Sequence, residues 1–124
     1  MSKINKGGHT MNNLQRLHLE TKGIKLSQEE LIIYLQENNL QPFDEYSPQS
    51  ATSKKNIYSS ALAILESIAN NPSGMKSYKL DDMTVSDFHD NLMARIDQLE
   101  RKVRLLKTDE QLQNESSFFM LFDN

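Results

Sequence analysis

The residues of this chain that could do chemistry are few and scattered. There is no cysteine, which excludes a thiol nucleophile, a thiolate zinc site and a disulfide scaffold. The three histidines, His9, His18 and His89, stand far apart and form no metal-binding motif such as HExxH. No acid, base and nucleophile stand at a spacing that suggests an active site. We therefore expect no enzyme, no cofactor, no bound metal and no small-molecule substrate.

One acidic cluster could hold a cation, and it consists of Asp81, Asp82, Asp87 and Asp90. The cluster lacks the glycine and the regularly spaced ligands of an EF-hand loop. Acidic residues are favoured at the start of a helix, because they face the positive end of the helix dipole. A helix that begins near residue 84 therefore explains most of this cluster.

A basic run could face phosphate, and its members are Arg101, Lys102, Arg104 and Lys107. The alternative is a solvated helix end, because Asp97 and Glu100 stand four residues before Arg101 and Arg104 and can pair with them. The chain as a whole has a net charge of −3. That balance argues against a protein that coats nucleic acid or an anionic membrane.

The length of 124 residues fits a single small domain. Its mean hydropathy of −0.63 is low for a self-contained globule, so that either part of the chain is a tail or a partner completes the core. Residues 1–10 are expected to be a disordered leader. Lys6–Thr10 can also be encoded by a bacterial ribosome-binding sequence, which raises the hypothesis that translation starts at Met11; an ordinary flexible leader is the alternative.

Periodic apolar residues predict an all-α domain over residues 11–107, with about four helices packed around a central one. The helices are expected at residues 12–22, 28–39, 53–69 and 85–107, although a short strand is an alternative for the first. Capping residues support two of the starts, Ser27 with Glu30 and Thr84 with Asp87. The helix at 53–69 is rich in small residues, which allow close approach of its neighbours and suit the central position. Thr52 or Ser53 can cap it.

Two segments between the helices are expected to lack helical structure. Residues 41–53 contain two prolines and several polar residues, which predict a long irregular loop that Phe43 and Tyr46 pin to the domain. Residues 75–83 alternate in polarity and predict an extended segment or an edge strand that carries Tyr78 and Leu80.

The last helix of the domain carries a heptad-like apolar stripe: Val85, Phe88, Leu92, Ile96, Leu99, Val103 and Leu106. Such a stripe can face the core of its own domain or form a coiled coil between two copies. Three heptads are near the lower limit for a stable coiled coil, and we therefore favour the core.

Residues 108–124 are expected to form an extended C-terminal tail in which a polar spacer precedes an apolar docking segment: Phe118, Phe119, Met120, Leu121 and Phe122. Leaving these side chains in water at a flexible end would invite aggregation. The segment must therefore dock on its own domain, on another subunit or on a partner protein.

Several stretches of the chain carry a family resemblance. In the first half they are residues 14–20 (LQRLHLE) and 29–40 (EELIIYLQENNL), followed by Pro42 and Tyr46. In the second half they are residues 61–71 (ALAILESIANN) and the final helix, with Leu92, Arg95-Ile96 and Leu99. The order of these residues resembles the head-tail connector (adaptor, or head completion) proteins of siphophage-type tailed phages that infect Gram-positive bacteria. The leader and the apolar tail fall outside the resemblance.

The resemblance implies a structural virion protein of the neck, made in the cytoplasm of the bacterial host. Its subunits would form a ring of about twelve copies on the portal protein. The ring would extend the channel close to packaged double-stranded DNA, without tight or specific binding, and would offer a surface to a tail-side connector or stopper protein. No membrane partner is implied.

The resemblance also suggests roles for the residues named above. The apolar segment at 118–122 would anchor the subunit to the portal. Phe43, Tyr46, Tyr78 and Leu80 would be candidates for subunit or tail-side contacts, and the basic run at 101–107 for the face that lines the channel. The alternative function is a small helical regulatory or binding protein that dimerises through the heptad stripe at 85–106.

Overall fold

The computed structural model describes the backbone of residues 10–122 and the side chains of residues 10–116. The described residues form five α-helices and one 3-10 helix, in the order α1 (Asn13–Glu20), α2 (Gln28–Glu37), α3 (Ala51–Ala69), η1 (Pro72–Ser77), α4 (Val85–Leu105) and α5 (Asp109–Phe122). The all-α class is confirmed. The leader falls almost wholly on residues 1–9, which lie outside the described part.

Hydrogen bonds from side chains fix where the helices begin. Ser27 and Glu30 form the expected capping box at the start of α2, and the Thr84 hydroxyl accepts the N–H of Asp87 at the start of α4. A further capping box, between Asn12 and Gln15, starts α1 as a helix and removes the strand alternative for that segment. The cap of α3 is Ser50, so this helix begins earlier than Thr52 or Ser53 would place it.

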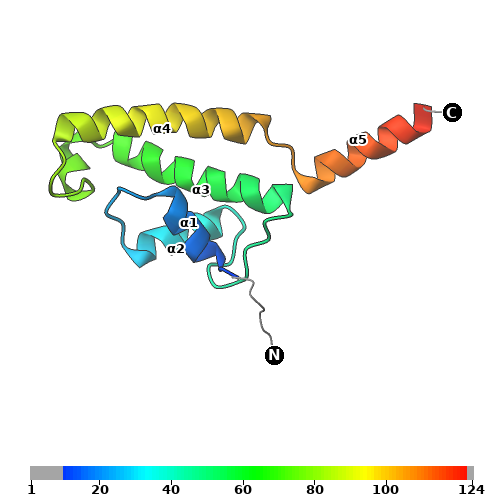
Figure 1. The fold of residues 1–124 in the computed structure, drawn as a ribbon, viewed down its shortest axis with the longest axis horizontal. Helices are drawn as coiled ribbons and strands as arrows, with labels where there is room; N and C mark the ends of the chain where they lie inside the picture. Colours follow the sequence, from blue (N-terminus) through cyan, green and yellow to red (C-terminus); the bar gives the residue numbers. More distant parts are fainter. Residues whose placement is uncertain (1–9, 123–124) are drawn as a thin grey trace.

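Helix α3 occupies the centre of the bundle, as expected. It lies beside α4 along most of its length, while α1 and α2 cover its other side and η1 packs near its end (Figure 1). After α2, the backbone of Asn39 takes a left-handed conformation with φ 65°, and Leu40 folds back to donate its N–H to the carbonyl of Leu35.

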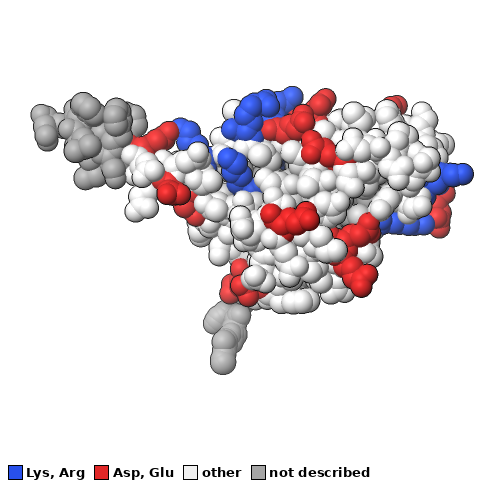
Figure 2. Space-filling view, turned by 180° about the vertical axis from the view of Figure 1, so that it is seen from behind, with Lys and Arg blue, Asp and Glu red and all other residues white. Residues whose placement is uncertain are grey.

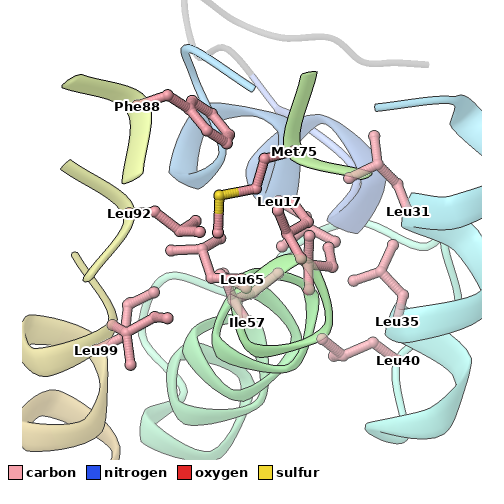
Figure 3. Close-up of a cluster of buried hydrophobic side chains, with 14 of the residues drawn as sticks. Leu17, Leu31, Leu35, Leu40, Ile57, Leu65, Met75, Phe88, Leu92 and Leu99 are labelled. Atoms are coloured by element: carbon pink, nitrogen blue, oxygen red, sulfur yellow. The ribbon is translucent and has the colours of Figure 1, made fainter. Parts of the chain in front are cut away.

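The core lies between α3 and the helices around it. Side chains from every element except α5 point into this space (Figure 3). Leu17, Leu35, Ile57, Leu65 and Leu99 are fully buried there. Burying one such side chain stabilises the fold by about 1.5 to 3 kcal/mol relative to leaving it exposed. The bundle therefore has a core of its own, although the mean hydropathy of the chain is low.

The heptad stripe of α4 contributes its middle to this core. Phe88, Leu92, Ile96 and Leu99 are buried, whereas Val85 at one end of the stripe is more than a third exposed. Because α4 lies against α3 over this length, the stripe is an intramolecular packing surface.

The two segments between helices differ from expectation in part. The expected extended segment at 75–83 is not formed: its first residues belong to the 3-10 helix η1, because Pro72 suits the first helical position and Met75 is buried beneath α3, and residues 78–83 form turns and bends. The described residues contain no named strand, and only one isolated bridge joins Asn12 to Glu45. Around this bridge, the loop before α3 is held to the start of α1 by backbone bonds, such as Tyr46 N–H to the Met11 carbonyl at 2.8 Å.

The polar spacer of the tail is helical, whereas we expected it to be extended. Residues 109–122 form α5, which points away from the bundle (Figure 1). Thr108 and Gln111 cap it reciprocally, at 3.1 Å and 2.8 Å, so that the polar residues of the spacer supply a helix start. The tail is thus an arm with a defined direction.

Candidate functional site

An open groove lies where α3 begins, α4 ends and α5 begins. Tyr58, Leu105, Leu106 and Leu112 form its apolar surface, and its volume is about 490 Å³. Leu105 is 70% exposed and Leu112 is 48% exposed. Exposed apolar side chains that cluster and are rimmed by polar groups mark interaction sites on soluble proteins. This groove is the candidate docking surface of the chain.

Three lysines rim the groove. Lys102 holds its ammonium 4.9 Å from the centre of the Tyr58 ring, a cation–π contact, and Lys107 pairs with Glu115 of α5. Neither Lys54 nor Lys102 forms an ion pair with any carboxylate in the described part of the chain. The groove therefore combines an apolar surface with two lysines, Lys54 and Lys102, that have no ion-pair partner among the described residues.

Hydrogen bonds between Asp109 and the start of α3 set the direction of α5. The carboxylate of Asp109 accepts the hydroxyl of Ser50 at 2.5 Å and the N–H of Ala51 at 2.8 Å. The N–H of Asp109 in turn donates to the hydroxyl of Thr52 at 2.8 Å. The bond from Ser50, supported by those at Ala51 and Thr52, lowers the pKa of the Asp109 carboxyl below its ordinary value. We call this set of bonds the Asp109 latch.

The predicted basic run lies at the C-terminal end of α4, beside the groove. Lys102 and Lys107 rim the groove, while Arg101 and Arg104 are exposed. Basic side chains, with acidic ones beside them, lie over this half of α4 at the top of Figure 2. The expected pairs of Arg101 and Arg104 with acids four residues earlier are not among the ion pairs of the described residues.

The four residues predicted for subunit or tail-side contacts have different environments. Phe43 is 65% exposed and Leu80 is partly exposed, so both can meet a partner. Tyr46 belongs to the core, where Arg16 stacks over its ring, and its side chain does not reach the surface. Tyr78 is half-buried and its hydroxyl donates to Glu30 at 2.8 Å, which ties η1 to the start of α2. Only Phe43 and Leu80 therefore keep the exposure that such contacts need.

The apolar docking segment lies at the far end of the α5 arm. The helix continues to Phe122, and the side chains of Phe118, Phe119, Met120, Leu121 and Phe122 lie outside the described ones. The latch and the capped start of α5 direct this end of the chain away from the bundle (Figure 1).

One polar cluster was missed by sequence reasoning. The carboxylate of Glu20 accepts a hydrogen bond from Arg16 at 2.9 Å and a second from Arg95 of α4. The spacing of four between Arg16 and Glu20 is a visible signal, but Arg95 lies 75 positions away and no local pattern points to it. The cluster joins α1 to α4 beside a cavity of about 230 Å³ that Phe88 helps to line.

The described residues contain no group of three or more histidines or acids that could hold a metal ion. In the acidic cluster, Asp81 pairs with Lys25 at 2.6 Å; this hydrogen bond lowers the pKa of the Asp81 carboxyl. None of the described helices combines the length and the apolar character needed to cross a membrane. The groove and the arm are the features of the described chain on which we base a functional proposal.

Comparison of the chain with protein-family models, with curated proteins and with solved structures found no match. The comparisons therefore assign neither a family nor a relative to this chain.

Proposed function

We propose that this chain is a structural virion protein, a head-tail connector of a siphophage-type tailed phage that infects a Gram-positive host. In this role it assembles as a ring of about twelve copies on the portal protein. The ring extends the DNA channel of the neck and offers a docking surface to a tail-side connector or stopper protein. The proposal takes its family from the sequence resemblance.

The observation that carries the proposal is the α5 arm. A rigid bundle with its own core sends out a capped helix that ends in the apolar segment at 118–122 (Figure 1). An arm of this kind contributes little to the core of its own subunit and is suited to reach another protein. In the proposed neck, the arm reaches the portal and its apolar segment is the anchor.

The surface of the bundle also suits a ring subunit. A subunit in a closed ring needs two different contact surfaces, one for each neighbour. Phe43 and Leu80 lie on separate loops and expose apolar surface, while the groove beside Leu105 offers another apolar patch. Phe43 and Leu80 are our candidates for contacts with neighbouring subunits or with the tail-side protein.

The charge distribution suits a channel through which DNA moves. A net charge of −3 keeps the subunit from binding phosphate tightly, since affinity for DNA rises with the number of phosphate contacts. The exposed Arg101 and Arg104 on α4 are the basic residues we assign to weak, non-specific contact with DNA.

The test is binding to the portal protein of the same phage. The full chain is expected to form rings on purified portals, seen by electron microscopy, whereas a chain that ends at Ser116 is expected not to bind. Ile33→Glu is the control, because Ile33 is exposed on α2 and lines neither the groove nor the arm. Normal portal binding by the shortened chain would overturn the anchor assignment, and failure of the full chain to bind would overturn the proposed function.

The alternative is a small regulatory protein that dimerises through the stripe at 85–106. The middle of that stripe is buried against α3, so a dimer of this kind would require α4 to leave the bundle. Separating the two helices would expose Phe88, Leu92 and Leu99 to water. The connector therefore remains the function that we propose.

A further inference from the structure

The groove is left unfilled by the arm that begins beside it. Leu112, in the first half of α5, lines the groove, and the helix then continues away from the bundle. Each helical residue advances about 1.5 Å, so the apolar segment starts roughly 9 Å further along the axis. The Asp109 latch opposes a swing of α5 about residues 106–108 that would bring this segment back. The arm of the same copy is therefore poorly placed to cover the groove.

The chemistry of the groove describes its occupant. Tyr58, Leu105 and Leu112 offer apolar surface to a partner, and Lys54 and Lys102 favour a partner with an acidic group close to its apolar part. The chain itself contains a segment with this combination, since the apolar run at 118–122 is followed directly by Asp123. Groove and segment are complementary in polarity and in charge.

We propose that, in the protein free of portal, the apolar segment 118–122 of one copy docks in the groove of a second copy. Its apolar side chains cover Leu105 and Leu112, and Asp123 comes within reach of Lys54 and Lys102. Groove and segment are different surfaces, so the contact is heterologous: each copy can give its arm to one neighbour and accept the arm of another. A series of such contacts closes into a ring where the rotation between copies allows it.

This inference rests in part on the proposed function and deepens it, because it names what holds the arm before the subunit reaches the portal, but its physical basis is independent of the portal. Both ideas use the segment at 118–122. In the proposed neck, the portal would therefore compete with the neighbouring groove for the arm. When the portal-bound ring forms, the arm would leave the groove of the neighbouring copy and bind the portal.

The test pairs two variants that each lack one half of the contact. Leu105→Glu keeps the arm but places a charge in the groove, and the chain that ends at Ser116 keeps the groove but lacks the segment. The full chain is expected to self-associate with rising concentration in sedimentation experiments, and each variant alone is expected to stay monomeric. A mixture of the two variants is expected to form a one-to-one complex. Ile33→Glu is the matched control and should self-associate like the unaltered chain.

Three outcomes would overturn the inference: a full chain that stays monomeric at every concentration, self-association of the Leu105→Glu variant, or a mixture that remains monomeric. A disulfide experiment gives a second readout, since the chain has no cysteine of its own. Leu105→Cys mixed with Phe119→Cys is expected to form a cross-linked pair, whereas Ile33→Cys mixed with Phe119→Cys is not. Equal cross-linking in both mixtures would also overturn it.

The outcomes for the two proposals can be told apart with the same proteins. Leu105→Glu retains its arm and is expected to bind the portal, whereas it should not accept the arm of another copy. Self-association without portal binding by the full chain would overturn the proposed function and leave the docking of the arm in place. Portal binding by a full chain that never self-associates would overturn the docking of the arm and leave the proposed function in place.

Discussion

The hydroxyl of Ser50 donates a hydrogen bond of 2.5 Å to the carboxylate of Asp109, across 59 positions of sequence. The same hydroxyl accepts the N–H of Ser53 and so caps α3, while Asp109 lies in the first turn of α5. One side chain thus joins the start of the central helix to the start of the arm. The orientation of the arm depends on this junction, because only residues 106–108 separate α4 from α5.

Removing the carboxylate of Asp109 should loosen the arm. Asp109→Ala deletes the acceptor of two hydrogen bonds while the core of the bundle stays intact. We expect the distribution of distances between spin labels at Lys55→Cys and Gln113→Cys to broaden, with little change in the midpoint of thermal unfolding. Glu110→Ala, in the same turn of α5, is the control. An unchanged distribution in Asp109→Ala would show that the latch does not orient the arm.

The latch should also respond to acid. Hydrogen bonds from Ser50 and Ala51, supported by the contact with Thr52, lower the pKa of Asp109 in the folded protein, so its stabilising effect is complete above the ordinary carboxyl pKa of about 3.9. The effect is lost as the pH falls through the lowered pKa. The same spin-label distances should therefore stay constant from neutral pH to about pH 5 and broaden only in stronger acid. A broadening centred near neutral pH would contradict this.

Because the α4 stripe packs in the core, truncating one of its buried side chains should lower the free energy of unfolding substantially. Leu99 is fully buried against α3, and Leu99→Ala should reduce the free energy of unfolding by about 2 to 5 kcal/mol. Leu105→Ala, at an exposed position of the same helix, should change it by less than about 0.5 kcal/mol. Urea denaturation measures both. Similar small changes in both variants, together with loss of a dimer in Leu99→Ala, would favour the coiled-coil alternative.

The charge cluster between α1 and α4 should contribute to stability. Glu20 is only 14% exposed at its side chain and bonds to both Arg16 and Arg95, so Glu20→Ala leaves two guanidinium groups without their acceptor. We expect a loss of about 2 kcal/mol in the free energy of unfolding. Glu100→Ala, an exposed acid on α4, should cost far less. A loss in Glu20→Ala no larger than in this control would mean that the cluster adds nothing.

The bond between Tyr78 and Glu30 should be visible in a titration. Donation to the Glu30 carboxylate raises the pKa of the Tyr78 hydroxyl above its ordinary value. The stabilisation is therefore complete below the ordinary tyrosine pKa of about 10 and is lost as the pH rises through the raised value. Ultraviolet titration of tyrosinate in the native protein and in Tyr78→Phe assigns the signal, and Glu30→Gln should return it toward the ordinary pKa. A Tyr78 pKa that does not change in Glu30→Gln would contradict the assignment of its shift to Glu30.

The helices of the bundle could be predicted because their signals are local. The Ser27–Glu30 capping box and the stripe from Phe88 to Leu99 carry their information within a few residues, and the structure follows both. The expected extended segment after α3 was wrong, because alternating polarity over a few residues does not distinguish a strand from the turn that Pro72 and the buried Met75 form. The start of α3 was misplaced because Ser50, Thr52 and Ser53 are all acceptable caps.

Parts of the candidate site could likewise be predicted from the sequence, and other parts could not. From the sequence alone, the basic run at 101–107 and the apolar segment at 118–122 could be recognised as unusual, since composition and charge are local properties. The groove could not be found in this way, because Tyr58, Leu105 and Leu112 belong to three helices that meet only when the chain is folded. The burial of Tyr46 and the exposure of Phe43, three residues apart, likewise depend on how the loop lies on α1.

The sequence by itself therefore determined the all-α class, the central position of α3 and the presence of an apolar run at 118–122. These follow from the periodicity of apolar side chains and from capping chemistry, which act within one or two helical turns. Only the tertiary structure decided that the stripe of α4 is buried, that the tail is a directed arm and that a lysine-rimmed groove lies beside it. Contacts such as Ser50 with Asp109 and Glu20 with Arg95 join residues far apart in the chain, and their geometry exists only once the helices have packed.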